Sequence, residues 1–350
     1  MPALAVADAL RDQGADVFFL GARGRLEADL VPAAGYEIEL LDVRGIDRGK
    51  PLKALGAVAK AARAVPAAKR ILRARGADVV MGGGGYVAGP GGLAALRLKL
   101  PLVLTEADRH LGLANRLLAR RARRVCLAFD IPGLDGERYV VTGRPVPAAI
   151  GGADRASARS RFGIDPERPC LLVFGGSQGA RSINLAAMDA YAGPEGSGAP
   201  PADRTYHVLH IAGHRDFALA QERVRAAGGL PHYTLVEYEP GLADSLAACD
   251  LVLARSGGSI FELAAAGRPA ILVPYPHAAA DHQRANAAWM RDAGAAVVIE
   301  DSELDGAAVR ERAGALLGDA TRLAEMSAAS ASLARPDAAR DVASQILGQA

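Results

Sequence analysis

The sequence predicts an α/β protein of two Rossmann-like domains, each a doubly wound parallel sheet with helices on both faces. Short apolar segments alternate with helical patterns along the whole chain, which is typical of parallel sheets. This alternation occurs twice, on either side of Gly143-Arg144-Pro145-Val146-Pro147, where two prolines interrupt both patterns. The chain has 350 residues, which is long for one hydrophobic core and sufficient for two domains.

The first half begins with helical periodicity at Ala3–Gln13, and Pro2 occupies a favourable first position for that helix. The strands expected after it are Val17–Leu20, Val79–Met81, Leu102–Leu104 and Arg124–Ala128. A doubly wound domain normally begins with a strand that becomes central in its sheet. We therefore expect that a first strand and the glycine-rich loop after it are missing from this chain.

The second half repeats the pattern after the prolines. The strands expected there are Leu171–Phe174, His207–Ile211, Leu235–Tyr238, Leu251–Ala254, Ala270–Val273 and Ala296–Ile299. A stretch rich in glycine and proline, Gly193–Pro201, is expected to be a surface loop. The segment Ala338–Leu347 is expected to be a last amphipathic helix.

The composition excludes several classes of protein. The net charge is +2, so the whole chain lacks the basic excess of a nucleic-acid-binding protein, and we expect no nucleic acid partner. No apolar stretch is long enough to span a membrane. Cys126, Cys170 and Cys249 lie far apart without a C-x-x-C pair, which argues against a zinc site or a disulfide framework. We expect no metal and no cofactor.

The most informative loop is Gly175-Gly176-Ser177-Gln178-Gly179, which lies between the apolar strand ending at Phe174 and a helical segment. A strand, a glycine-rich turn and a helix in this order direct free backbone N–H groups and the positive helix end at a phosphate. Glycine permits close approach of the ligand, and Ser177 offers a hydroxyl group. The spacing matches neither the dinucleotide nor the P-loop pattern. A tight turn without a ligand is the alternative interpretation.

Glycines also follow the expected strand Val79–Met81, from Gly82 to Gly92. A glycine run contributes no core packing and its ordering costs entropy, so it favours a loop whose amides wrap a bulky anion such as pyrophosphate. A flexible linker is the alternative. After the next strand, Glu106 and Asp108 could hold sugar hydroxyls or act as a base, and Asp108 could equally cap a helix.

Two later loops carry polar side chains at the ends of expected strands, where α/β folds bind ligands. Arg255-Ser256-Gly257 follows Leu251–Ala254, and Glu262 lies one turn into the next helical segment. Glu262 could accept hydrogen bonds from a ribose diol, or it could be a first-turn acid favoured by the helix dipole. Gln283 and Asn286 lie one turn apart on one helical face, a pair suited to sugar hydroxyls.

In their order along the chain, these loops resemble those of the MurG family of peptidoglycan N-acetylglucosaminyltransferases, which belong to glycosyltransferase family 28 and have the GT-B fold. The motifs that carry the resemblance are Gly84-Gly85-Tyr86, Gly89-Pro90-Gly91-Gly92, Gly175-Gly176-Ser177-Gln178-Gly179-Ala180, Arg255-Ser256-Gly257 and the segment from Glu262 to Asn286. The resemblance covers essentially the whole chain. It implies inverting, metal-independent transfer of N-acetylglucosamine from UDP-N-acetylglucosamine to undecaprenyl-pyrophosphoryl-N-acetylmuramoyl-pentapeptide (lipid I), giving lipid II.

The resemblance also implies roles for individual residues. Ser177 is expected at the donor diphosphate, Glu262 at the ribose and Gln283 at the sugar, with the backbone of Glu239 at the uracil. The full donor-side set is Gly176, Ser177, Gln178, Gly179, Glu239, Arg255, Ser256, Gly257, Glu262, Gln283 and Asn286. The acceptor-side set is Gly84, Gly85, Tyr86, Glu106, Asp108 and Asn115. Residues 1–147 with 336–350 are then the acceptor and membrane-facing domain, and residues 148–335 the donor domain.

The sequence departs from the family pattern in several places. The family's first glycine-rich loop, which carries a histidine proposed as the catalytic base, would end before Pro2. Its absence argues against full activity of the chain as written. The family's His-Glu-Gln-Asn reads Thr105-Glu106-Ala107-Asp108, which leaves Glu106 as the candidate base. Pro147 stands where the family has an arginine, and the turn after Arg255 is one residue short.

Basic residues are concentrated in the first half. One cluster, within Lys50–Arg75, comprises Lys50, Lys53, Lys60, Arg63, Lys69, Arg70, Arg73 and Arg75, and a second comprises Arg116, Arg120, Arg121, Arg123 and Arg124. A basic amphipathic surface can lie on anionic lipid, at roughly 1 kcal/mol per basic residue near the membrane. Solvated helix faces are the alternative. We expect a peripheral protein on the cytoplasmic side of the bacterial cell membrane that docks through both clusters.

Other functions compete with the transferase. A UDP-sugar 2-epimerase shares the fold and the nucleotide loops, but it needs acidic and histidine groups around the sugar and no lipid surface. A degenerate, non-catalytic transferase that acts as a membrane scaffold would account for the missing first loop. A dehydrogenase is disfavoured, because the strands ending at Leu20 and Ile211 are not followed by the acid that binds an NAD ribose.

Overall fold

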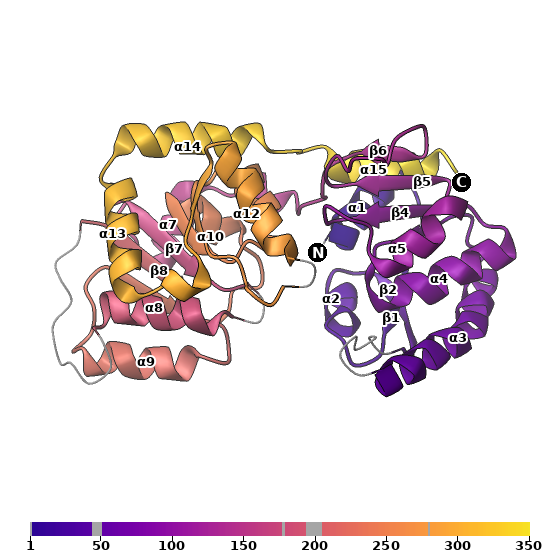
Figure 1. Ribbon diagram of the computed structural model, residues 1–350, viewed down its shortest axis with the longest axis horizontal. Helices are drawn as coiled ribbons and strands as arrows, with labels where there is room; N and C mark the ends of the chain where they lie inside the picture. The colour runs from indigo at the N-terminus through magenta and orange to yellow at the C-terminus, as the bar shows by residue number, and fades with distance from the viewer. Residues whose placement is uncertain (1, 44–50, 177–178, 194–204, 279–280) are drawn as a thin grey trace. The chain divides into compact units, whose positions relative to one another are not determined.

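The chain folds into two compact units in the computed structural model, which describes residues 2–43, 51–176, 179–193, 205–278 and 281–350, with the backbone alone at 51–62 and 86. Unit 1 comprises Met1–Pro147 and Arg335–Ala350, and unit 2 comprises Ala148–Ala334. Both consist of parallel strands and helices that alternate along the chain (Figure 1). In the described part of the chain, no helix is both long enough and apolar enough to cross a membrane.

Unit 2 contains a six-stranded parallel sheet in the order β12-β11-β10-β7-β8-β9. The strands are β7 (Cys170–Phe174), β8 (His207–Ile211), β9 (Tyr233–Val236), β10 (Leu251–Ala254), β11 (Ala270–Leu272) and β12 (Ala296–Val298). The first strand of unit 2, β7, is central, and the order reverses between β7 and β10. In folds of this kind, ligands bind at that reversal, outside the carboxyl ends of the strands.

Helices cover the sheet of unit 2, so every residue of β7, β8 and β10 is buried. The helices are α6 (Ala149–Gly152), α7 (Arg155–Phe162), α8 (Arg181–Tyr191), α9 (Phe217–Ala226), α10 (Ala243–Ala248), α11 (Ile260–Ala265), α12 (His282–Asp292), α13 (Gly306–Leu317) and α14 (Ala320–Ser332), with the 3-10 helix η3 (Asp301–Glu303). Ile183 and Ala187 of α8 share one buried cluster with Val309 and Ala313 of α13. These small and branched side chains let the two helices pack closely.

A buried arginine of α7 joins that helix to the amino ends of β7 and β10. The side chain of Arg159 is 3% exposed, and its Nη2 donates to Asp250 at 2.8 Å. Its Nε donates to the carbonyl of Ala248 at 3.0 Å, and its Nη1 donates at 2.8 Å to the carbonyls of Asp165, Pro166 and Arg168. Asp250 also accepts from the N–H of Cys170 at 2.8 Å. The guanidinium is therefore fully used inside the fold.

Unit 1 has two parallel sheets, β1-β2 and β3-β4-β5-β6, which share no ladder in the described residues, where the sequence predicts one sheet. The strands are β1 (Phe18–Ala22), β2 (Glu37–Leu41), β3 (Val80–Gly82), β4 (Leu102–Glu106), β5 (Arg124–Leu127) and β6 (Tyr139–Val141). The helices are α1 (Pro2–Arg11), α2 (Glu27–Ala33), α3 (Pro51–Ala74), α4 (Gly85–Leu98), α5 (Leu113–Leu118) and α15 (Ala338–Leu347), with η1 (Ala119–Arg121). One buried cluster spans both sheets and includes Ala22, Leu41, Val80 and Leu104.

The last helix, α15, belongs to unit 1. Val342 and Ile346 of α15 share a buried cluster with Val6 and Leu10 of α1 and with Val103 of β4. The chain passes between the units at two places, before Ala148 and after Ala334.

Gly143 lies beside the second of these passages, with a φ of 82°. A Cβ at this position would lie 2.6 Å from the Cβ of Arg335. Glycine is therefore required here both by backbone conformation and by space.

The glycines from Gly82 to Gly92 were expected to form one anion-binding loop, and the structure corrects this. The helix α4 already begins at Gly85, so only Gly83 and Gly84 connect it to β3. A Cβ on Gly92 would lie 2.6 Å from Cδ1 of Leu118, and a Cβ on Gly82 would lie 2.8 Å from Cδ2 of Leu104. Several of these glycines thus serve the close packing of α4 against α5 and the sheet.

Candidate functional site

The loop between β7 and α8 is built so that the main chain turns sharply at the reversal of the strand order. A Cβ on Gly175 would lie 2.0 Å from the backbone nitrogen of Ala180, which no side chain can occupy. Gly176 and Gly179 have φ values of 82° and 70°, and the N–H of Gly179 donates to the carbonyl of Gly176 at 3.0 Å. Ser177 and Gln178 lie outside the described residues. The first N–H groups of α8 have no acceptor within the helix, and the N-terminus of a helix that follows such a turn is where an anion is bound in folds of this kind.

A buried polar network fixes the first turn of α8 to the sheet below it. Asn184 is fully buried, and its Nδ2 donates to the carbonyl of Ala212 at 2.8 Å and to the carboxylate of Asp216 at 2.9 Å. Asp216 is also buried and accepts from Arg181 at 3.0 Å. The carbonyl of Ala212 lies 3.0 Å from the position of a Cβ on Gly179. The network therefore positions the glycine loop through α8 and through the end of β8.

His210 completes this network in one tautomer. Because Nδ2 of Asn184 donates to two acceptors, its Oδ1 accepts the hydrogen bond from Nε2 of His210, at 3.0 Å. Nδ1 of His210 then accepts from the hydroxyl of Tyr233 at 2.6 Å. Burial lowers the pKa of His210 to about 4, although the charge of Asp216 acts in the opposite direction. The imidazole is thus neutral at physiological pH and acts as a structural group.

We expect acid to destabilise unit 2 through His210. The unfolded chain takes up a proton as the pH falls below the ordinary pKa of 6.5, whereas the folded chain does so only near 4. The difference in pKa lowers the free energy of unfolding by about 2 kcal/mol between pH 7 and pH 5. Urea unfolding at the two pH values measures it, and His210→Gln, which cannot titrate, should lack this part of the loss. Equal losses in both proteins would contradict the assignment.

The loop after β10 lies beside the first, and its arginine is held by neighbouring elements. Arg255 forms an ion pair with Asp301 of η3 at 2.6 Å, and its Nη2 donates to the hydroxyl of Ser182 in α8 at 2.7 Å. That hydroxyl donates to Asp301 at 2.8 Å, which closes a ring of three side chains. The side chain of Arg255 is 12% exposed. Arg255 therefore connects the ends of β7 and β10. Its guanidinium, which was expected to contact the donor, is held by Asp301 and Ser182.

Two residues expected to bind sugar hydroxyls have different surroundings. Asn286 is buried, and its Nδ2 donates to the carbonyl of Ser256 at 3.0 Å, so it supports the loop from beneath. The hydroxyl of Ser256 donates to the carbonyl of Gln283 at 2.7 Å. The side chain of Gln283 is half-buried, accepts from the N–H of Tyr275 at 3.0 Å, and has its Nε2 3.8 Å from the position of a Cβ on Gly257. Of the expected pair, only Gln283 lies at the surface of this loop.

The remaining donor-side residues lie on neighbouring elements. Glu262 is half-buried in the first turn of α11, as expected for an acid near the positive end of a helix. Glu239 follows β9, and its carboxylate forms a two-point ion pair with Arg161. Sequence reasoning missed His210, Asp216 and Arg161, because their roles depend on partners that are distant in the chain.

In unit 1, the carboxylate of Glu106, the expected candidate base, is hydrogen-bonded within its own loop. Its carboxylate accepts from the backbone N–H groups of Ala107, Asp108 and Gly112 at 3.0, 3.2 and 2.8 Å, and from Nδ2 of Asn115 at 3.0 Å. These four donors hold the carboxylate in place within the loop. The helix α5 begins after Gly112, so Asp108 does not cap it. Asn115 is buried and serves the same loop, and the side chain of Tyr86 lies outside the described residues.

Comparisons with known proteins match the whole of this architecture. A model of the glycosyltransferase family 28 N-terminal domain matches residues 1–127, and one of the family 28 C-terminal domain matches residues 170–342. A UDP-N-acetylglucosamine–N-acetylmuramyl-(pentapeptide) pyrophosphoryl-undecaprenol N-acetylglucosamine transferase of Moorella thermoacetica is 40% identical, over 99% of this chain and 94% of its own length. The protein of the same name from Halorhodospira halophila is 43% identical, over 98% and 92%.

Among solved structures, the crystal structure of MurG from Acinetobacter baumannii superposes with a TM-score of 0.74. It is 29% identical, and the match covers 99% of this chain and 95% of that one. The α/β fold with two parallel-sheet domains is therefore the GT-B fold. These matches do not show that a first strand and loop are missing, and they give no support to the doubt about activity that followed from that expectation.

Proposed function

The chain belongs to glycosyltransferase family 28, and we propose that it transfers N-acetylglucosamine from UDP-N-acetylglucosamine to lipid I, giving lipid II for peptidoglycan synthesis. The observation that carries the proposal is the junction of β7, its glycine loop and α8 at the reversal of the strand order. This junction is suited to a diphosphate, because helix amides and the helix dipole act together on negative charge.

The proposed reaction is a displacement at C1 of the transferred sugar. The C4 oxygen of the acceptor forms a bond to C1 of N-acetylglucosamine and gives up its hydroxyl proton to a base as the bond from C1 to the UDP oxygen breaks, with inversion at C1. Negative charge then develops on the leaving diphosphate. The N-terminus of α8 is held in place before the reaction by Asn184 and Arg181, so little reorganisation is needed when this charge appears.

The individual donor contacts belong to the same proposal. Ser177 is assigned to the diphosphate, Glu262 to the ribose, Gln283 to the sugar and the backbone of Glu239 to the uracil. Gln283 is supported by its half-buried side chain and its position beside Gly257. The acceptor is assigned to unit 1, near Gly84 and the loop after β4.

Turnover tests the function directly. The purified protein is incubated in EDTA with UDP-N-acetylglucosamine and a short-chain lipid I analogue, and the release of UDP is measured together with the disaccharide product. We expect both products in equal amounts. A control without acceptor tests for UDP-N-acetylmannosamine, the product of a 2-epimerase. Formation of that sugar, or no product at all in either reaction, would contradict the proposal.

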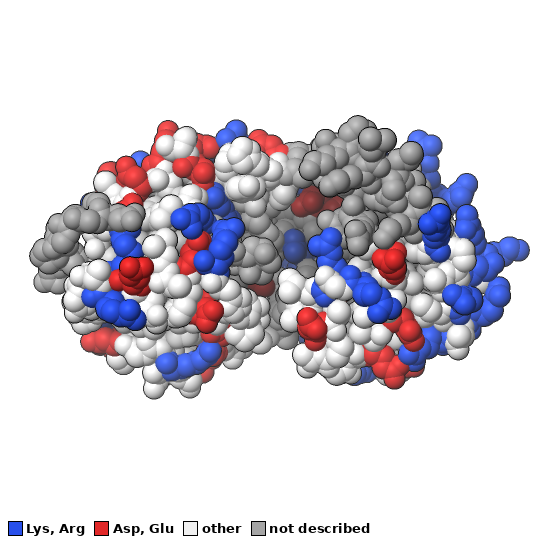
Figure 2. All heavy atoms as spheres, turned by 90° about the horizontal axis from the view of Figure 1, so that it is seen from below, with Lys and Arg blue, Asp and Glu red and all other residues white. Residues whose placement is uncertain are grey.

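We also propose that the protein is a peripheral membrane protein that docks through unit 1. Lys and Arg gather over unit 1 on the face in Figure 2, whereas acidic and basic residues are mixed over unit 2. An α4–α5 patch is defined by exposed apolar and basic side chains that alternate on the two helices and η1: Leu93, Arg97, Leu113, Arg116, Leu117, Arg120 and Arg121. Apolar side chains within a basic surface suit an anionic lipid interface.

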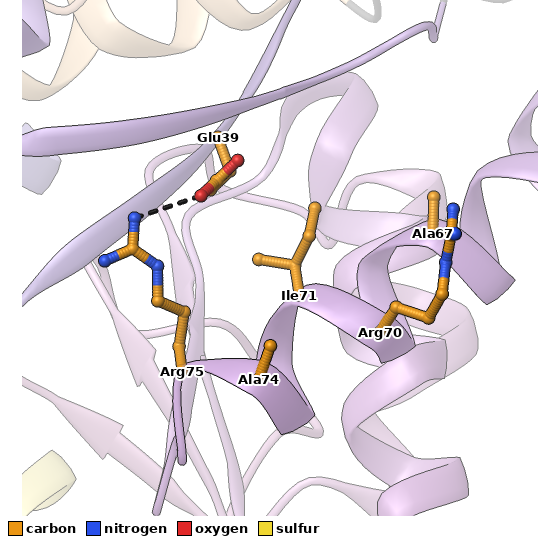
Figure 3. A pocket seen from close by; sticks show the side chains of 6 residues that line it. All are labelled: Glu39, Ala67, Arg70, Ile71, Ala74 and Arg75. Atoms are coloured by element: carbon orange, nitrogen blue, oxygen red, sulfur yellow. Dashed lines mark hydrogen bonds and ion pairs between the residues drawn. The ribbon is translucent and has the colours of Figure 1, made fainter.

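The other expected docking segment, Lys50–Arg75, is described only in part. The side chains of Lys50, Lys53 and Lys60 lie outside the described residues. Arg75 is paired with Glu39 at 3.0 Å across a shallow pocket of about 230 Å³ between β2 and α3, and Arg70 lies on the other side of this pocket (Figure 3). Because Arg75 is engaged in this ion pair, the α4–α5 patch is the better-supported docking surface.

Vesicle co-sedimentation with phosphatidylglycerol tests the patch. Leu117 is 71% exposed, and Leu117→Glu should weaken binding at least tenfold, because it removes the insertion of a leucine and adds a charge that anionic lipid repels. Leu26→Glu is the matched control, since Leu26 is 58% exposed and lies just before α2, outside the patch. Binding of the unchanged protein should fall with salt. Equal binding by the two variants would contradict docking through α4 and α5.

A further inference from the structure

The segment that follows β9 is held on the side of the loop after β8. The carbonyl of Glu237 accepts from the N–H of Gly213 at 2.8 Å, which extends the strand pairing by one residue beyond β9. The ring of Tyr238 stacks on that of His214, with centroids 5.0 Å apart and planes 21° apart. Nδ1 of His214 also lies 2.8 Å from the carboxylate of Glu237. One flank of this segment is thereby fixed.

Arg161 of α7 holds the other flank. Its Nη1 and Nη2 donate to the two carboxylate oxygens of Glu239 at 3.0 and 2.8 Å, and its Nη1 also donates to Asp244 at 2.6 Å. Glu239 precedes α10 and Asp244 lies in its first turn, so one guanidinium joins both ends of this loop. The side chain of Glu239 is only 7% exposed, whereas that of Arg161 is 46% exposed. Without Arg161, a nearly buried carboxylate would face a second carboxylate, and the loop would have to move.

The backbone N–H and C=O of Glu239 are available for hydrogen bonds to a ligand. Within the described part of the chain, neither its N–H nor its C=O is engaged in a hydrogen bond. Glu239 lies directly beyond the carboxyl end of β9, the side of the sheet at which ligands bind in this fold. A residue with an anchored side chain and unpaired peptide groups is suited to reading the edge of a planar ligand by backbone hydrogen bonds.

We infer that Arg161 is a positioning residue for the nucleobase of the donor: it holds Glu239 so that the backbone there distinguishes uracil from cytosine. This inference rests on the proposed function, which supplies the uridine nucleotide. Uracil presents N3–H and O4 on the edge where cytosine presents N3 and an amino group, so donor and acceptor are exchanged. A backbone held in one position accepts only one of these patterns, and the mismatch leaves polar groups unpaired.

Calorimetric titration with UDP and with CDP tests the inference. Arg161→Ala should weaken UDP binding by roughly tenfold and CDP binding by much less, so that the UDP preference of the unchanged protein falls. In turnover, KM for the UDP-sugar should rise while kcat stays within about twofold, because the diphosphate contacts are unchanged. Arg161→Lys should restore little of the UDP affinity that Arg161→Ala loses, since lysine cannot form the two-point contact. The double variant Arg161→Ala with Glu239→Ala should bind UDP no more weakly than Arg161→Ala alone.

The controls separate this inference from the proposed function. Arg322→Ala removes a half-exposed arginine paired with Glu325 on α14, and it should change neither affinity nor selectivity. If the unchanged protein binds no UDP, the proposed function fails. If it binds UDP and Arg161→Ala retains the same preference over CDP, the function stands and the role of Arg161 is overturned. Equal weakening of UDP and CDP also overturns it, because that is the result of a merely structural contact.

Discussion

Gly175→Ala is expected to reduce the rate of sugar transfer by at least about 100-fold while the protein remains folded. The new Cβ would lie 2.0 Å from the backbone nitrogen of Ala180 and 2.5 Å from the carbonyl carbon of Gly179. Both neighbours are main-chain atoms, so the loop between β7 and α8 must move as a whole. Loss of a single preorganised donor to a developing negative charge costs roughly 10² to 10³ in rate, and here the whole group of donors shifts.

Steady-state turnover of UDP-N-acetylglucosamine measures this effect, and circular dichroism confirms that the variant is folded. Gly314→Ala is the matched control, because Gly314 lies in α13 with nothing within 4 Å of its Cβ position. That variant should keep full activity and gain slightly in stability, since alanine favours a helix by roughly 1 kcal/mol over glycine. A fully active Gly175→Ala enzyme would show that the loop is only a connection between strand and helix.

Arg159→Ala is expected to lower the free energy of unfolding of unit 2 by about 3–5 kcal/mol. The substitution leaves the carbonyls of Asp165, Pro166 and Arg168 without their donor. It also removes the buried partner of Asp250, the residue that accepts from the N–H of Cys170 at the start of β7. Such a loss is a large part of the stability of an ordinary domain.

Urea unfolding followed by circular dichroism measures this loss. Arg155→Ala is the control, because Arg155 contacts the same carboxylate at 2.5 Å but has a side chain that is 41% exposed. Arg155→Ala should lower the free energy of unfolding clearly less than Arg159→Ala, since water can replace an exposed donor. Equal losses for the two variants would mean that burial of Arg159 contributes nothing of its own.

The sequence predicts the strands that are buried on both faces. His207–Ile211 and Leu251–Ala254 agree with β8 and β10 residue for residue, because a strand within a parallel sheet is mostly apolar, although β8 also carries two histidines. The strands β2 and β6 were missed. In β2 the acids Glu37 and Glu39 alternate with apolar residues, and β6 has only three residues. Short edge strands of this kind give no continuous apolar signal.

The candidate site was predictable at the level of loops and less so at the level of side chains. The turn at Gly175 and the loop at Arg255 follow from local order along the chain. Whether Glu106 faces a substrate or its own loop depends on Gly112 and Asn115, six and nine residues later. Glycines that serve helix packing, such as Gly92, have the same appearance in a sequence as glycines that serve an anion.

The association of α15 with α1 has a consequence for how the protein emerges during synthesis. All of unit 2 is synthesised before Val342 and Ile346, yet these residues complete the buried cluster around Val6 and Leu10. Unit 1 therefore cannot complete this cluster until the last residues of the chain have emerged. Until then the apolar face of α1 is uncovered, and it is the segment that chaperones would be expected to protect.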